Sequence, residues 1–176
     1  MANNDIQWFN ELIKNDRKNN LSSKRKAEIK ELLYNFVDNC PAKDGPTDAK
    51  KFDDYGFKHG SDYGKYKQRI FKNISLLSTN YIFIESPKTF ADYKGKIISL
   101  YNGRKTPTII FAKGNYGEID TLFIKLRNAF AHKNYFKKGD YYILWNDGQN
   151  HDKLSCFMVL KYNHLISIFN ELIERD

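Results

Sequence analysis

Long apolar runs are missing from this sequence. No stretch approaches the roughly 18 to 20 apolar residues that a membrane-spanning helix needs. The first segment, MANNDIQWFNELIKND, is polar and lacks the apolar region of a secretory signal peptide. Cysteine is also scarce, with Cys40 before a proline and Cys156 inside an apolar run. The two cysteines match no disulfide or metal pattern, so we expect reduced thiols in a cytoplasmic protein that does not enter a membrane.

Signatures of cofactor use are equally hard to find. The glycines of GNYGEID lack the lysine and the strand–loop–helix context of a phosphate-binding loop. Aspartate and glutamate are scattered along the chain, and no His/Cys spacing typical of a zinc site occurs. We therefore expect no cofactor and no metal.

What the sequence does have is positive charge and aromatic residues. Lys and Arg number 29 against 21 Asp and Glu, which gives a formal net charge of +8 and a pI of about 9.3. This balance favours an anionic partner, and nucleic acid or an anionic membrane surface would both fit. Hydrophobic residues make up 41% of the chain and aromatic residues 15%, enough for the core of one domain spanning residues 1–176.

Apolar residues recur at helical spacing through much of the chain. The spacing predicts helices over 6–13, over 22–39 up to the Cys40-Pro41 stop, from Tyr66 towards Leu77, over 118–133, and from Tyr162 to the end. Ile70, Phe71, Ile74 and Leu77 are expected to face inward in the third of these helices, and Leu165, Ile168, Phe169 and Leu172 in the last.

Strand signals are weaker. DYYILW and KLSCFMVLKY flank the turn signal NDGQNHD and predict a β-hairpin insertion over 140–160. NYIFIES fits a helix or a strand, KIISLY suggests a helix and TIIF a short strand. The Gly-, Pro- and Asp-rich segment 41–64 indicates a long surface loop. The expected fold class is mainly α: a bundle of about five helices with a small β-hairpin before the C-terminal helix.

One helix end carries an unusual set of polar residues, in LRNAFAHKNYF. At about 100° per residue, Asn128 and His132 lie about 100° and 140° around the axis from Arg127. The apolar residues of the helix occupy an almost opposite sector: Ile119, Leu122, Phe123, Leu126 and Phe130. The three polar residues therefore form a patch on the side away from the core.

Two interpretations of this patch are open. Arg and His near a helix C-terminus favour the helix dipole and satisfy terminal carbonyls without any chemistry. Alternatively, Asn128 stacks one turn below His132 at the (i, i+4) spacing and can orient the imidazole of a reactive histidine.

The string LRNAFAH resembles the RNxxxH signature of HEPN-domain proteins, in which an Arg and a His lie near the end of a helix in an α-helical bundle. The resemblance implies a metal-independent endoribonuclease that leaves a 2′,3′-cyclic phosphate and a 5′-OH. It implies catalytic roles for Arg127 and His132, with Asn128 positioning them. It also implies a homodimer, in which the Arg and His of two protomers meet in one composite site.

The residue types suit that chemistry. Imidazole titrates near neutrality and can move a proton to or from a ribose oxygen. A guanidinium stays charged and offers a fork of donors to phosphoryl oxygens. In family toxins paired with a nucleotidyltransferase antitoxin, a Tyr follows two residues after the His. Here that position is Asn134, and the tyrosine is Tyr135.

Lysines and aromatic residues follow the motif directly: Lys133, Tyr135, Lys137 and Lys138. Lysines beside aromatic rings suit a single-stranded RNA, so these four are candidate substrate-binding residues. A solvated lysine-rich loop is the alternative.

The sequence predicts two alternative functions. The first is an endoribonuclease of the HEPN kind, a cytoplasmic homodimer acting on RNA in bacterial defence or a toxin–antitoxin setting, under the control of an antitoxin or regulatory protein. The second is a non-catalytic helical domain that binds nucleic acid or protein through its charge.

Overall fold

The structure is a computed structural model and describes residues 6–16, 23–41, 51–85, 90–147 and 153–173. The α-helices are α1 (Gln7–Ile13), α2 (Ser23–Leu33), α3 (Gly60–Asn73), α4 (Lys94–Asn102), α5 (Glu118–Ala131) and α6 (Tyr162–Ile173). The strands are β1 (Tyr81–Ile84), β2 (Thr108–Ala112), β3 (Tyr135–Lys138), β4 (Tyr141–Asp147) and β5 (Leu154–Lys161). Short helical segments are the π-helical η2 (Tyr34–Asp38) and the 3-10 helices η3 (Phe52–Tyr55), η4 (Ser78–Asn80) and η5 (Phe90–Tyr93).

The strands form one mixed sheet in the order β1-β2-β5-β4-β3. β1 and β2 are parallel and are connected through α4, while the other neighbouring strands are antiparallel. Ile109 of β2 pairs with Met158 of β5, and Leu144 of β4 pairs with the same residue from the other side. β5 therefore lies at the centre of the sheet.

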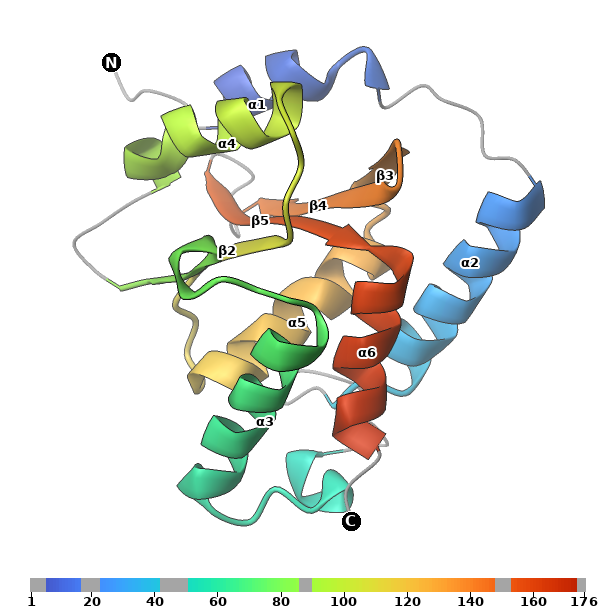
Figure 1. The fold of residues 1–176 in the computed structure, drawn as a ribbon, viewed down its shortest axis with the longest axis vertical. Helices are drawn as coiled ribbons and strands as arrows, with labels where there is room; N and C mark the ends of the chain where they lie inside the picture. Colours follow the sequence, from blue (N-terminus) through green and yellow to red (C-terminus); the bar gives the residue numbers. More distant parts are fainter. Residues whose placement is uncertain (1–5, 17–22, 42–50, 86–89, 148–152, 174–176) are drawn as a thin grey trace.

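Alternation along the strands divides the core in two. Cys156, Met158 and Leu160 of β5 face one cluster, while Phe157 and Val159 face the other. α1 and α4 cover the face of Phe157, and α3, α5 and α6 cover the opposite face (Figure 1). The described chain is thus three layers, helices–sheet–helices.

The expected fold class, a helical bundle with one small hairpin, is wrong. The two predicted strands at the hairpin do pair antiparallel, but they form the middle of a five-stranded sheet. The bundle was expected because the strand signals were interpreted as one local hairpin: β1 fitted a helix or a strand, β3 was not predicted, and the pairing of β1, β2 and β5 joins segments that are distant in the chain.

The predicted inward residues of α6 are all buried, whereas those of α3 are only partly so. Ile70 and Ile74 are buried, but Leu77 is 63% exposed. The helix ends at Asn73, and the positive φ of 51° at Ser75 turns the chain away from the helical direction. Leu77 consequently leaves the helical stripe.

The expected surface loop 41–64 needs a correction where the structure describes it. Residues 42–50 lie outside the described residues, as does the predicted turn at 148–152. From residue 51 onward the segment packs inward: Phe52 and Phe57 are buried with ring centroids 5.2 Å apart, and α3 begins at Gly60. In the described part of the chain, no helix has the length and apolar character needed to cross a bilayer.

Candidate functional site at the C-terminal end of α5

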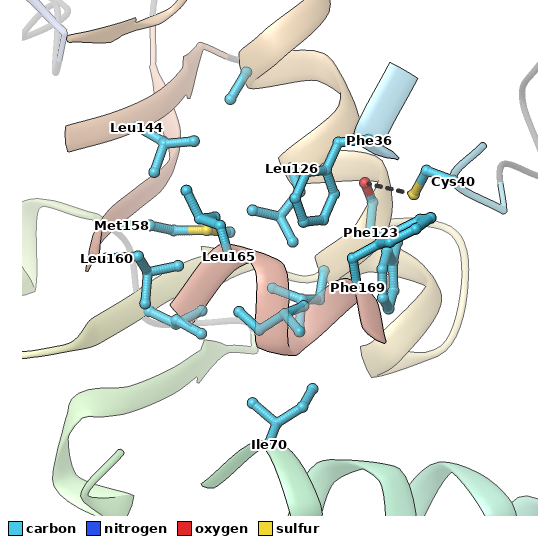
Figure 2. Packing of buried hydrophobic residues seen from close by; sticks show 14 of the residues in the cluster. Phe36, Cys40, Ile70, Phe123, Leu126, Leu144, Met158, Leu160, Leu165 and Phe169 are labelled. Atoms are coloured by element: carbon cyan, nitrogen blue, oxygen red, sulfur yellow. Dashed lines mark hydrogen bonds between the residues drawn. The ribbon is translucent and has the colours of Figure 1, made fainter. Parts of the chain in front are cut away.

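α5 is anchored by its apolar face. The five residues predicted to face the core are all buried: Ile119, Leu122, Phe123, Leu126 and Phe130. Phe36 of η2 stacks on Phe130 with ring centroids 5.5 Å apart. Phe36, Phe123, Leu126 and Phe169 gather in the same core region (Figure 2). Such packing fixes the rotation of α5, and with it the direction of its polar side.

The helix ends in a Schellman arrangement. The His132 N–H donates to the Asn128 carbonyl at 3.0 Å, the Lys133 N–H to Phe130 at 3.2 Å, and the Asn134 N–H to Ala129 at 2.8 Å. Lys133 takes the left-handed position with a φ of 57°, where glycine is the usual residue. His132 is therefore the capping residue directly after the last helical residue, Ala131, and its side chain is exposed.

The predicted single polar patch needs a correction, because Arg127 lies on a different side of α5 from His132. Burial raises the pKa of the Cys40 thiol, and the nearby Arg127 charge opposes that rise. The same thiol lies 3.9 Å from the Phe123 carbonyl (Figure 2). Arg127 is therefore near the segment that follows η2. The Arg127 and His132 directions differ by about 140° around the helix.

The three side chains of the motif differ in exposure but are alike in lacking partners in the described part of the chain. Arg127 and Asn128 are half-buried and His132 is exposed. Among the residues that the structure describes, none of the three side chains makes a hydrogen bond or an ion pair. The described part of the fold therefore does not use their donors and acceptors.

The four predicted substrate-binding residues separate in the structure. Lys133 is exposed beside His132. Tyr135 packs on Phe130 with ring centroids 5.3 Å apart, and burial raises the pKa of its hydroxyl. Tyr135 is thus mainly a packing residue, while Lys133 faces solvent.

Lys137 contacts an acid and an aromatic ring. Its Nζ lies 2.8 Å from Glu28 Oε2, and both side chains are mostly buried, with exposures of 15% and 12%. The Tyr142 hydroxyl donates to the same carboxylate oxygen at 2.7 Å, and the Lys137 ammonium lies over the Tyr142 ring. These contacts tie β3 to α2.

Lys138 is paired in the same way on the other face of the sheet. Its Nζ lies 2.8 Å from Asp16 Oδ2 and 3.7 Å from the centroid of the Tyr101 ring. The Tyr101 hydroxyl also donates to this carboxylate. Lys138 therefore joins β3 to the residues just after α1, and its charge is already neutralised.

A residue outside the sequence prediction belongs to the same face of α5. Lys125 precedes Asn128 by three positions and His132 by seven, so the three share one side of the helix. Its Nζ donates to Ser155 Oγ at 3.0 Å, at the start of β5. The motif begins at the Arg-Asn pair and does not include this earlier lysine. The spacing of Lys125, Asn128 and His132 at i, i+3 and i+7 is the sequence signal that could have identified it.

A hollow lies at the N-terminal end of α5. It has a volume of about 500 Å³ and is lined by Gly60, Tyr63, Gly64 and Lys67 of α3 and by the first turn of α5. Lys67 Nζ and Glu118 Oε1 form an ion pair of 2.7 Å on its wall. This hollow is separated from His132 by the length of α5. Among the described residues, no group of three or more His, Cys, Asp or Glu side chains is placed to hold a metal ion.

Fold and site together define an α/β protein with a mixed sheet between helical layers and an open Arg–Asn–His cluster at the end of one helix. No family model, no curated protein and no solved structure matches the chain. The function must accordingly be argued from the residues.

Proposed function

We propose that the protein is a metal-independent endoribonuclease of the HEPN kind, with Arg127 and His132 as catalytic residues and Asn128 as the residue that positions them. The observation that carries this proposal is the state of the motif. Its histidine is exposed at the C-cap of α5, and its three polar side chains have no hydrogen-bond or ion-pair partner among the described residues. A purely structural Arg–Asn–His cluster would be expected to use these groups as caps or ion pairs.

The proposed reaction is a transesterification within the RNA strand. The ribose 2′-oxygen attacks the adjacent phosphorus, the bond from phosphorus to the 5′-oxygen breaks, and a 2′,3′-cyclic phosphate forms. One proton leaves the 2′-OH and one is gained by the departing 5′-oxygen. Imidazole can perform either transfer, and the Arg127 guanidinium can stabilise charge that develops on the phosphoryl oxygens.

A homodimer would complete this site. One imidazole handles one proton transfer at a time, so the complementary acid or base must come from elsewhere. The wide angle between Arg127 and His132 in one chain also favours a site that draws on two chains. A twofold axis next to the end of α5 would bring two copies of His132 together.

The five-stranded sheet does not support the resemblance to HEPN-domain proteins. That resemblance implied a helical bundle, and this fold is different. The proposal therefore depends on the motif and its place at a helix end, since chemistry resides in sites that different folds can carry. The place in bacterial defence or in a toxin–antitoxin pair, and restraint by an antitoxin or regulatory protein, follow from the resemblance alone.

The test is cleavage of a single-stranded RNA in EDTA. We expect the wild type to leave 2′,3′-cyclic phosphate ends, and His132→Ala to reduce the rate about 100-fold or more, because proton transfer is lost. Arg127→Ala should reduce it by a similar factor, with partial rescue by Arg127→Lys, which retains the charge but not the fork of donors. His59→Ala, which removes an exposed histidine at the start of α3, is the matched control and should cleave normally.

Other outcomes would contradict the proposal. Equal cleavage by the wild type, His132→Ala and Arg127→Ala would remove the assignment of the site. Binding of RNA without cleavage by any of them would favour the non-catalytic alternative. Co-refolding the wild type with excess His132→Ala tests the shared site: mixed dimers would have one histidine, so wild-type activity should fall even when RNA is in excess.

A further inference from the structure

Lys125 is an unusual lysine. It is partly buried against β4 and β5, and burial lowers the pKa of its ammonium. Ser155 Oγ is its hydrogen-bond partner at 3.0 Å, and no carboxylate pairs with it among the described residues. Placing a cation away from water costs free energy unless an anion compensates for it.

The surroundings of Lys125 hold its position firmly. Asn146 Nδ2 donates to the Lys125 carbonyl at 2.5 Å, which fastens this turn of α5 to the end of β4. Ser155 Oγ also lies 3.2 Å from the carbonyl oxygens of Asn146 and Asp147, so the hydroxyl that accepts the hydrogen bond from Lys125 is itself held in place. The site is thus preorganised around the lysine by two strands.

Lys125 and His132 are on the same side of the helix. Their seven-residue separation corresponds to about 10 Å along the axis and a rotation of only about 20°. Asn128 lies between them on the same side. The end of β4 lies close to this stretch, because Asn146 bonds to Lys125 and Asp147 Oδ1 lies 3.4 Å from the Nδ2 of Asn134, two residues past His132. Because Lys125 and His132 share one side of α5, an RNA strand with its reacting phosphate at His132 would reach Lys125 by running along the helix.

We infer that Lys125, positioned by Ser155, binds a phosphate of the RNA strand near the one that is cut, and that this contact supplies the missing anion. This inference rests on the proposed function for the direction of the strand. The ammonium has N–H donors beyond the one directed at Ser155, and a phosphate oxygen can accept them.

The inference is tested by binding rather than by cleavage. The probe is a short single-stranded RNA with 2′-O-methyl groups, which cannot undergo the 2′-OH attack, and its affinity is measured over a series of KCl concentrations. Lys125→Met should weaken binding about 10-fold and make the slope of log affinity against log salt shallower by about 0.7, the value for one phosphate contact on a single strand. Ser155→Ala should weaken binding by a smaller factor with the salt slope retained, because the charge stays but its anchor is gone.

Lys72→Met is the matched control, since Lys72 is an exposed lysine on α3 and the substitution changes the net charge equally. It should leave affinity and slope almost unchanged. Stability gives a second readout: a lysine that serves only the fold would destabilise the protein when replaced, whereas Lys125→Met should keep or raise the melting temperature because an uncompensated buried charge is removed.

The two proposals fail in different ways. Equal affinities and slopes for Lys125→Met and Lys72→Met, or a wild type that does not bind the probe, would overturn the phosphate contact. A shallower slope for Lys125→Met together with no effect of His132→Ala on cleavage would retain the contact and overturn the catalytic site.

Discussion

The lysines of β3 and the lysines of α5 and its end differ in what they contact. Lys137 and Lys138 each lie 2.8 Å from a carboxylate and over an aromatic ring. The Lys125 ammonium contacts only a hydroxyl, and Lys133 is exposed, without a hydrogen-bond or ion-pair partner among the described residues. All four lie within a short span of the sequence, yet two form ion pairs inside the fold and two have no carboxylate partner among the described residues.

This difference changes how the basic cluster is interpreted. Lysines beside aromatic residues suggested RNA binding at Lys137 and Lys138, but the aromatic rings they contact belong to the fold. A lysine without a carboxylate partner among the described residues, Lys125, lies on α5, on the same side of the helix as His132. Whether a lysine can bind an anionic ligand depends on whether a carboxylate already pairs with it, and not on how many lysines are close in the sequence.

The largest expected effect is on the Lys137 pair. Lys137→Met leaves the mostly buried Glu28 carboxylate without its cation, and we expect the free energy of unfolding to fall by about 2 kcal/mol, measured by urea denaturation. Adding Glu28→Gln should recover part of the loss. RNA affinity of the folded Lys137→Met protein should stay close to that of the wild type. A loss of affinity without a loss of stability would contradict the comparison.

The Lys138 pair should show a pH signature. Hydrogen bonds from Lys138 and Tyr101 hold the pKa of Asp16 below its ordinary value of 3.8, so the folded state favours the carboxylate. This stabilisation is present above pH 3.8 and is lost as the pH falls through the lowered pKa of the folded protein. Asp16→Asn should therefore cost about 1 kcal/mol at pH 7, and the difference from the wild type should shrink below pH 3.8.

Unfolding curves at pH 7 and between pH 2 and 4 measure the effect of Asp16→Asn on stability, because an unperturbed aspartate has a pKa of about 4. Asp53→Asn, on the exposed side of η3, is the control variant. A constant difference between Asp16→Asn and the wild type across this range would show that the carboxylate contributes no pH-dependent stability.

The smallest effect concerns Lys133. Its φ of 57° is a conformation that glycine adopts without strain, so Lys133→Gly should raise the free energy of unfolding by about 0.5 kcal/mol. Lys133→Ala removes the same charge but keeps the strained conformation, and it should give no such gain. Equal stabilities for the two variants would mean that the left-handed position costs little here.

Helix content was accessible from the sequence wherever apolar residues recur locally. The buried sides of α5 and α6 followed from spacing alone, because a helix repeats every 3.6 residues and each neighbour is close in the chain. β1 and β2 were harder, because strands buried on both faces lose the alternation that identifies a strand. Their parallel pairing also joins residues on either side of α4, which no local pattern records.

The candidate site divides along the same line. Arg127, Asn128 and His132, and the side of α5 on which they lie, are consequences of consecutive residues and helical geometry. The partners of the neighbouring lysines are not: Glu28 and Asp16 lie 109 and 122 residues from Lys137 and Lys138. Ser155, which holds Lys125, is 30 residues away. By itself the sequence determined a polar motif at a helix end, whereas the tertiary structure decided which lysines near it are paired with carboxylates, because only packing brings distant carboxylates to some of them and not to others.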